Sequence, residues 1–251
     1  MQLKQKLLNG EKIGGLMLRV NRNPATMIIA KNAGLDFLML DCEHGNYSFE
    51  TLHDMFLAGN AAGIAGFVRV PVGTKDYISR ALDSGATGVM VPMVETVEQA
   101  EALVHYSKYQ PVGGRGFCAG CSHTEYLGGV HTDIMKEQND RVIAIAQIET
   151  KQAIDNIEKI AAVKGLDAML IGPNDLSLSL GIPGDLMNPI ELEAIAKVAA
   201  ACKKNGLAFG LHAGKALLEK FREELTLCMS LTDIDLLMDG FKNVRGVIDA
   251  L

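Results

Sequence analysis

Charged, imidazole and amide side chains recur where short apolar runs of this sequence end. In chain order they are Asp41, Glu43, His44, Arg69, Glu149, Asn174, Asp175 and His212. If each run is a strand of a parallel barrel, all of these groups lie at the C-terminal ends of strands, where barrel enzymes carry their catalytic residues. The spacing therefore predicts that ionisable groups from five strands converge on one mouth.

Two of these carboxylates are candidate metal ligands. Glu149 and Asp175 follow successive apolar runs, and a pair of hard oxygen donors that leaves positions open for water and substrate suits Mg²⁺ or Mn²⁺, with Co²⁺ as a further choice. A structural reading competes with this one, because acidic residues are also favoured in the first turn of a helix. The spacing alone leaves both readings open.

The other polar positions indicate anion binding and proton transfer. The turn Gly172-Pro173-Asn174-Asp175 could hold a carboxylate on its backbone amides, or it could be a plain strand-to-helix turn. Arg69 ends an apolar run and needs an anionic partner, either a substrate or a structural ion pair.

His44 is a candidate base because acidic residues flank it. Asp41 is near in the chain, and Asp83, at the end of an expected helix, is a second candidate partner. A loop histidine beside acids is also commonly just solvated.

A repeated alternation of apolar runs and helical periodicity must position these groups. The expected strands are residues 13–19, 36–41, 65–70, 87–91, 142–148, 167–171, 207–211 and 226–230. The expected helices are 25–33, 48–62, 74–84, 96–107, 150–161, 189–205, 213–223 and 232–249. Eight such units predict one α/β domain over residues 1–251, a closed TIM (β/α)₈ barrel.

One feature of this pattern concerns the choice of fold, and a second concerns a long connection between two expected strands. An open doubly wound sheet is the competing architecture, but no glycine fingerprint follows a first strand. Residues 110–141 form a single long connection, which we expect to be a functional loop.

Net charge, apolar runs and cysteine content limit the classes of binding partner and the cellular location that we expect. A formal charge of -6 gives no reason to expect nucleic acid. No apolar run is long enough to span a membrane and no leader sequence is recognisable, so we expect a cytoplasmic protein that binds small molecules. The five cysteines are expected to be reduced thiols, with a zinc clip built on Cys118, Cys121, His123 and His131 as the less favoured reading.

A series of short motifs resembles the HpcH/HpaI aldolases, a family of metal-dependent 2-oxo-acid aldolases with a pyruvate-binding barrel. The motifs are Asp41-Cys42-Glu43-His44-Gly45, Arg69-Val70-Pro71, residues 81–86 (Ala-Leu-Asp-Ser-Gly-Ala), Val91-Pro92-Met93-Val94, Gly114-Arg115-Gly116, Gln147-Ile148-Glu149-Thr150 and residues 171–177 (Ile-Gly-Pro-Asn-Asp-Leu-Ser). They occur in order and extend over roughly residues 10–240, nearly the whole chain.

The resemblance implies a reversible cleavage of a 4-hydroxy-2-oxo acid to pyruvate and an aldehyde. Glu149 and Asp175 would hold a divalent metal that acts as a Lewis acid on the keto group, and Arg69 would stabilise the enolate oxygen. His44, oriented by Asp83 and near Asp41, would act through a water as the base. The pyruvate part would contact Gln147, Gly172, Pro173 and Asn174, and the family implies a homohexamer in which a C-terminal helix packs on a neighbouring subunit.

The sequence departs from the family pattern at three places. The loop Phe117–Tyr126 carries cysteines and a histidine, His212 replaces an apolar residue in the substrate pocket, and residues 232–235 lack the usual Gly-Ser-Asp character. These departures leave the aldehyde open. A CoA-thioester lyase or decarboxylase of the same fold, and a non-catalytic barrel that binds a 2-oxo acid, remain the alternatives.

Overall fold

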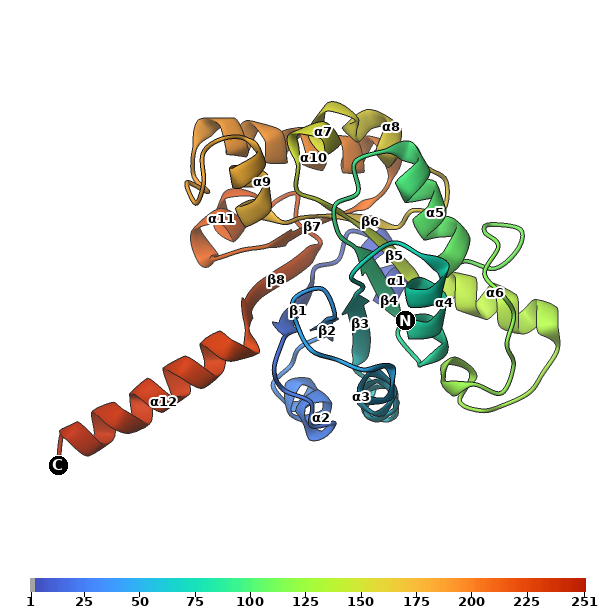
Figure 1. Cartoon of the computed structure of the whole chain (residues 1–251), viewed down its shortest axis with the longest axis horizontal. Coiled ribbons are helices and arrows are strands. Elements are labelled where there is room, and N and C mark those ends of the chain that lie inside the picture. Colours follow the sequence, from blue (N-terminus) through green and yellow to red (C-terminus); the bar gives the residue numbers. More distant parts are fainter. Residues whose placement is uncertain (1–2) are drawn as a thin grey trace.

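The computed structural model describes residues 3–251 as a barrel of parallel strands with helices around it (Figure 1). Within these residues, eight strands close in sequence order, β1-β2-β3-β4-β5-β6-β7-β8, with β8 paired to β1. The strands are β1 (Ile13–Leu18), β2 (Phe37–Asp41), β3 (Ala65–Arg69), β4 (Gly88–Val91), β5 (Ile143–Ile148), β6 (Ala168–Ile171), β7 (Ala208–His212) and β8 (Leu227–Thr232). The predicted TIM barrel is confirmed.

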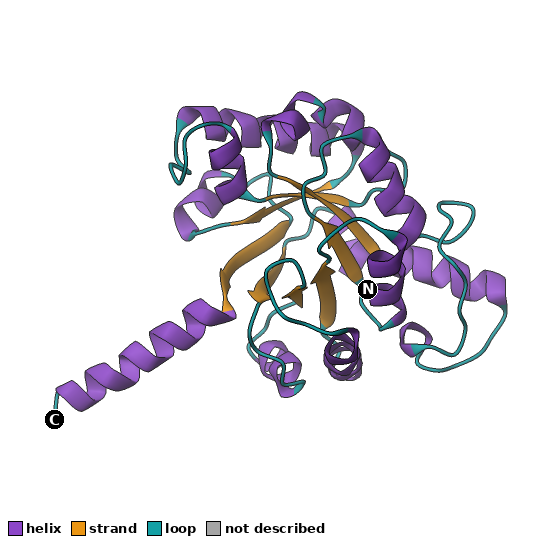
Figure 2. Ribbon diagram, viewed as in Figure 1, coloured by secondary structure: helices purple, strands orange, loops and turns teal. Residues whose placement is uncertain are grey.

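Helices cover the outside of the barrel, as Figure 2 shows. They are α1 (Leu3–Leu8), α2 (Ala25–Asn32), α3 (Phe49–Ala62), α4 (Lys75–Asp83), α5 (Val97–Ser107), α6 (His131–Arg141), α7 (Lys151–Asp155), α8 (Ile157–Ala161), α9 (Pro173–Ser179), α10 (Pro189–Asn205), α11 (Lys215–Lys220) and α12 (Asp233–Asp249), with a 3₁₀ turn η1 (Ser122–Thr124). The expected helix 150–161 is divided at Asn156, and the expected helix 213–223 is shorter.

Two packed layers explain why the strands are apolar on both faces. The lumen is filled mainly by Met, Ile, Leu and two stacked rings, Phe37 and Phe67, whose centroids are 4.5 Å apart. Glycines make room for them, because a Cβ atom at Gly15 would lie 2.4 Å from the Phe37 ring and one at Gly88 would lie 2.6 Å from the Phe67 ring. The outward-facing strand residues pack against the helices in a second, larger core.

The long connection is more structured than we expected. The prediction of a loop over 110–141 is wrong for α6, whose sequence is polar on nearly every side and so lacks a visible apolar stripe. Tertiary hydrogen bonds hold this helix in place: Gln138 Nε2 donates to the carbonyl of His123 at 3.0 Å, and Arg141 Nη2 donates to Asn60 Oδ1 at 2.8 Å. Helix α1 was also not predicted.

The Cys118 and Cys121 side chains form a disulfide, so the expectation of five reduced thiols is wrong for these two. Gly120 lies between them with a left-handed φ of 72°, and this turn brings their Cα atoms to 6.6 Å. Bonded sulfurs cannot act as thiolate ligands. Across residues 3–251 no three His, Cys, Asp or Glu side chains converge as a preformed metal cluster, so the zinc reading has no support.

Helix α12 extends away from the barrel, and its far end is remote from every other element (Figure 1). Only Asp233 at its start is buried. The Asp233 carboxylate accepts hydrogen bonds from the backbone N–H groups of Arg19, Val20 and Asn21 at 2.7–3.0 Å, so the base of the helix is tied to the loop after β1. In the described part of the chain, no helix has the length and hydropathy needed to cross a membrane.

The lumen rings provide a test of the packing. Truncating Phe67, which is fully buried, removes its stacking on Phe37 and leaves a cavity, so Phe67→Ala should lower the free energy of unfolding by about 3–5 kcal/mol. Denaturant unfolding measures this. Leu127→Ala, at a residue that is 66% exposed, is the matched control and should change stability by under about 0.5 kcal/mol; equal losses in both variants would contradict this packing.

Candidate active site

An ion pair between two adjacent strands forms the centre of the barrel mouth. Asp41 and Arg69 are the last residues of β2 and β3, and the parallel register places them directly side by side. Arg69 Nε donates to Asp41 Oδ1 at 2.9 Å and Arg69 Nη2 donates to Oδ2 at 2.7 Å, which is a two-point contact. Both side chains are buried, so the pair is largely shielded from water.

Asp41 also organises the loop that follows it. Its Oδ1 atom accepts the backbone N–H groups of Glu43 and His44 at 3.1 and 3.3 Å, and Oδ2 accepts Arg19 Nε at 3.0 Å. Burial by itself would raise the pKa of Asp41, but the hydrogen bond and charge of Arg69 outweigh it and hold this pKa below its usual value. Asp41 is therefore ionised and fully engaged, and it contacts the His44 backbone rather than the ring.

The imidazole of His44 lies closest to Glu43 among the acids predicted around it. His44 Nε2 is 3.9 Å from Glu43 Oε2, and the same carboxylate oxygen lies 3.0 Å from Arg69 Nη1. Burial raises the pKa of Glu43, and the charge of Arg69 opposes that rise. The His44 ring itself is more than half exposed at the mouth, where a substrate can reach it.

The expectation that Asp83 orients His44 is wrong within one chain. Asp83 is the last residue of α4, and helices of this fold run back to the N-terminal ends of the strands, far from the mouth. There Asp83 Oδ1 pairs with Arg115 Nη2 at 2.5 Å and lies 3.9 Å from His123 Nδ1. The sequence held a signal for this position, because a helix that connects two parallel strands ends on the side where the next strand begins, and the prediction did not take that direction into account.

Glu149 is a buried acid held in a fixed orientation. It follows β5, its Oε1 atom accepts the backbone N–H of Met93 at 2.8 Å, and its Oε2 atom accepts Gln147 Nε2. Gly172 lies against it, since a Cβ atom there would be 2.3 Å from Glu149 Oε2. Burial raises the pKa of Glu149 to about 7, and the negative charge of Asp175 adds to this effect.

Asp175 comes from the neighbouring strand unit. It lies in the first turn of α9, which begins at Pro173 directly after the β6 end. Its charge raises the pKa of both Glu149 and Glu43, so these acids lie within electrostatic reach of one another. The two predicted metal ligands thus lie within electrostatic reach of each other, and the helix-start role of Asp175 is compatible with a ligand role.

A cavity of about 370 Å³ opens between these groups. The residues that line it are Arg19, His44, Arg69, Gln147, Gly172, Pro173, Asn174, Asp175, His212, Ala213, Gly214, Leu231, Thr232 and Asp235. All of the predicted substrate-contacting residues line it. Arg19 and Asp235 were not predicted as site residues, although Arg19 directly follows the β1 run and could have been found by the same rule as Arg69.

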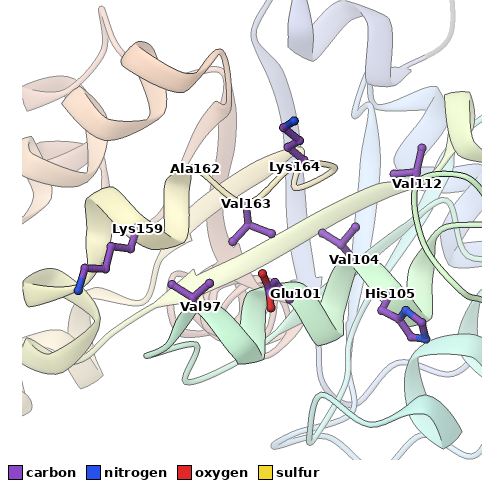
Figure 3. Close-up of a pocket in the computed structure, with 9 residues that line it drawn as sticks. All are labelled: Val97, Glu101, Val104, His105, Val112, Lys159, Ala162, Val163 and Lys164. Carbon is purple, nitrogen blue, oxygen red and sulfur yellow. The ribbon is translucent and has the colours of Figure 1, made fainter.

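A larger cavity of about 620 Å³ lies elsewhere, on the outside of the barrel between α5 and α8. Figure 3 shows its floor of Val97, Val104 and Val163, with Lys159 and Lys164 at the edges and directed away from that floor. None of its lining residues stands at a C-terminal strand end. The chemistry therefore belongs to the smaller cavity at the mouth.

Comparisons with known proteins agree with this geometry. Residues 16–233 match the family described as HpcH/HpaI aldolase/citrate lyase. Over 182 residues the chain is 40% identical to a 2-dehydro-3,6-dideoxy-6-sulfogluconate aldolase of Pseudomonas putida, covering 72% of this chain and 71% of that protein. It is also 40% identical over 190 residues to a 4-hydroxy-2-oxovalerate aldolase of Novosphingobium aromaticivorans, covering 74% and 71%.

The fold has a close counterpart among solved structures. A crystal structure of an HpcH/HpaI aldolase from Desulfitobacterium hafniense DCB-2 has a TM-score of 0.94 and 32% sequence identity, covering 100% of this chain and 98% of that one. The resemblance found in the sequence motifs is thereby confirmed. With a family match over most of its length, a barrel of the same shape and the motif residues gathered at one mouth, this chain belongs to the HpcH/HpaI aldolase/citrate lyase family.

Proposed function

We propose that this protein is a metal-dependent aldolase that reversibly cleaves a 4-hydroxy-2-oxo acid to pyruvate and an aldehyde. The observation that carries the proposal is that Arg69, Gln147 and Asp175 line one cavity, while Glu149 accepts Gln147 Nε2 and lies within electrostatic reach of Asp175. The relatives named above are aldolases, which supports a carbon–carbon lyase. Neither a CoA-thioester lyase, a decarboxylase nor a non-catalytic barrel is better supported.

The donor set fits a divalent cation. The charge of Asp175 adds to the raised pKa of the buried Glu149 carboxylate, and a cation between the two acids would offset this repulsion. Since no third carboxylate, imidazole or thiol joins them within residues 3–251, the remaining ligands would be water and substrate oxygens, as Mg²⁺ and Mn²⁺ prefer. Glu149 and Asp175 would hold the ion, which when bound supplies Lewis acidity at the keto oxygen. The choice among Mg²⁺, Mn²⁺ and Co²⁺ stays a prediction.

The chain's own residues would bind the pyruvate part on one wall. Arg69 Nη1 lies 3.5 Å from Gln147 Oε1, and both side chains line the cavity next to the turn Gly172–Asn174. The Arg69 guanidinium, held rigidly by Asp41, would stabilise negative charge on the pyruvate oxygen as it develops. Asp41 acts through Arg69 and the loop, so we assign it a positioning role.

The proton of the cleavage step needs an acceptor at the mouth. Breaking the C3–C4 bond of the substrate turns its 4-hydroxyl into the aldehyde carbonyl, releases the hydroxyl proton and leaves the bond's electron pair on the pyruvate enolate. His44 lines the cavity and is exposed, so we propose that it accepts this proton, directly or through a water. Protonation of the enolate at C3 then gives pyruvate.

Helix α12 supports the proposed homo-oligomer. Large apolar side chains along it are exposed, among them Leu237, Phe241, Val244 and Ile248 at helical spacing. A helix with such a face is stable in water only when another surface covers it. We propose that a neighbouring subunit covers it within a homohexamer. The cytoplasmic location expected from the sequence stays a prediction.

Removing one proposed ligand tests the metal site. Glu149→Gln keeps the shape but loses the charge, so Mn²⁺ should bind about 100-fold more weakly or worse, as measured by calorimetric titration. Metal-dependent exchange of the pyruvate methyl protons with deuterium should also be lost. Glu158→Gln, at an exposed position of α8, is the control, and undiminished exchange after exhaustive chelation would contradict a role for the metal.

The geometry of Arg69 gives a second test. Lys keeps the positive charge but cannot make the forked contact with Asp41, so Arg69→Lys should slow pyruvate formation by about 100-fold or more. Steady-state assays would be accompanied by circular dichroism to verify folding. Arg80→Lys, which affects an arginine stacked on Phe49 at 4.0 Å outside the cavity, should retain near-normal rates; a fully active Arg69→Lys variant would remove Arg69 from the mechanism.

The α12 face gives a third test. Phe241 is 67% exposed in the single chain, and placing a charge there should prevent burial against a neighbour. Phe241→Asp should therefore lower the mass measured by light scattering, whereas Lys242→Asp, beside it on the helix, should have a smaller effect. A chain that is monomeric before any substitution would refute the proposed assembly.

A further inference from the structure

The mouth cavity is also lined by polar side chains that the chemistry above does not use. They are Arg19, His212, Thr232 and Asp235. This inference rests on the proposed aldolase function. If pyruvate contacts Gln147 and residues 172–175, these other lining groups remain available to the aldehyde part of the substrate.

Arg19 presents a fixed guanidinium with unused donors. Its Nε–H donates to Asp41 Oδ2 at 3.0 Å, and its backbone N–H donates to Asp233 Oδ1 at 2.9 Å, so both ends of the residue are anchored. Within residues 3–251 the two Nη groups have no hydrogen-bond partner. The side chain is 34% exposed and lines the cavity, so a ligand can reach these donors.

The nearby acids do not satisfy the Arg19 Nη groups. Asp41 is already the two-point partner of Arg69. Asp235 caps α12, and its Oδ2 atom accepts the backbone N–H and the hydroxyl of Thr232, each at 2.8 Å. A guanidinium that is partly removed from water with open donor positions favours a ligand that brings oxygen acceptors.

His212 adds the complementary acceptor. Its Nε2 atom lies 3.1 Å from the carbonyl oxygen of Leu231. Because a carbonyl only accepts, this nitrogen donates, and a neutral ring then leaves Nδ1 as an acceptor. Burial lowers the pKa of His212, and the positive charge of Arg69 adds to this, so the ring is neutral near pH 7.

We propose that Arg19, with His212, determines the aldehyde specificity by selecting an aldehyde that carries a hydroxyl or carboxylate oxygen beyond its carbonyl. An alkyl aldehyde would leave the Arg19 donors desolvated and unpaired, and enzyme sites built to hydrogen-bond an oxygen discriminate strongly against analogues that lack it. Arg19 is thus a specificity-determining residue and takes no part in bond cleavage.

The test compares aldol addition of pyruvate to three small aldehydes: glycolaldehyde, glyoxylate and acetaldehyde. The wild-type protein should have a higher kcat/KM for the first two than for acetaldehyde. Arg19→Met should reduce this preference by about 10- to 100-fold. A larger loss with glyoxylate identifies the carboxylate as the favoured group, and a larger loss with glycolaldehyde identifies the hydroxyl. Arg22→Met, an exposed arginine in the same loop but outside the cavity, is the matched control and should keep the preference.

A second variant separates donor from acceptor. His212→Leu removes the Nδ1 acceptor but keeps Arg19, so the preference for glycolaldehyde, whose hydroxyl can donate, should fall while that for glyoxylate is kept. Deuterium exchange into pyruvate, which needs no aldehyde, is measured alongside. If the wild type exchanges but Arg19→Met changes all three aldehydes by the same factor, the selection role is overturned and the aldolase function stands. If the wild type does not exchange, the aldolase function fails and this inference fails with it.

Discussion

The buried contact between Asp41 and Arg69 is the constraint on which the mouth of this barrel depends. Two opposite charges at the ends of adjacent parallel strands satisfy each other where water is largely excluded. Removing either one would leave the other, buried charge with a single ionic partner, Glu43 for Arg69 or Arg19 for Asp41. The contact fixes the Arg69 fork, and through its remaining oxygen positions Asp41 also fixes Arg19 and the start of the His44 loop. Two side chains that line the cavity, Arg69 and Arg19, and the backbone at the start of the His44 loop are thus held by a single carboxylate.

Burial acts in opposite ways on the acids of this site, and the difference sorts their roles. Asp41 has strong partners, so its pKa falls despite its burial. Glu149 is also buried, but its partners are a backbone amide and a glutamine, and other acids are close, so its pKa rises to about 7. An acid of the first kind is a fixed structural anion, whereas one of the second kind gains stability when a cation arrives. The environments of the two carboxylates therefore favour Glu149, and not Asp41, as the metal ligand.

The residues that line the cavity come from two groups of strands. The residues assigned to pyruvate come from β5, the end of β6 and the first turn of α9. Arg19, His212 and Thr232, which also line the cavity, come from the ends of β1, β7 and β8. If the aldehyde is recognised at the β1, β7 and β8 ends, its identity can change without altering the groups at β5 and β6, because barrel enzymes change specificity through the loops after their strands.

Much of this structure could be predicted from local pattern. The eight apolar runs and the helical segments between them predicted the barrel correctly. A strand that is buried on both faces is a continuous apolar run, which can be recognised without knowing its distant contacts. The rule that strand ends carry function placed Arg69, Glu149, Asp175 and His212 correctly at one mouth.

Contacts between residues far apart in the chain decided the rest. Helix α6 is polar on most sides and is held by partners such as His123 and Asn60, so no apolar stripe could reveal it. Asp83 was assigned to His44, but the direction of α4 carries it to the opposite end of the barrel and to Arg115. Likewise, only the folded chain shows that Asp41 pairs with two guanidinium groups, those of Arg19 and Arg69. Sequence spacing gives the order of these residues but not their distances.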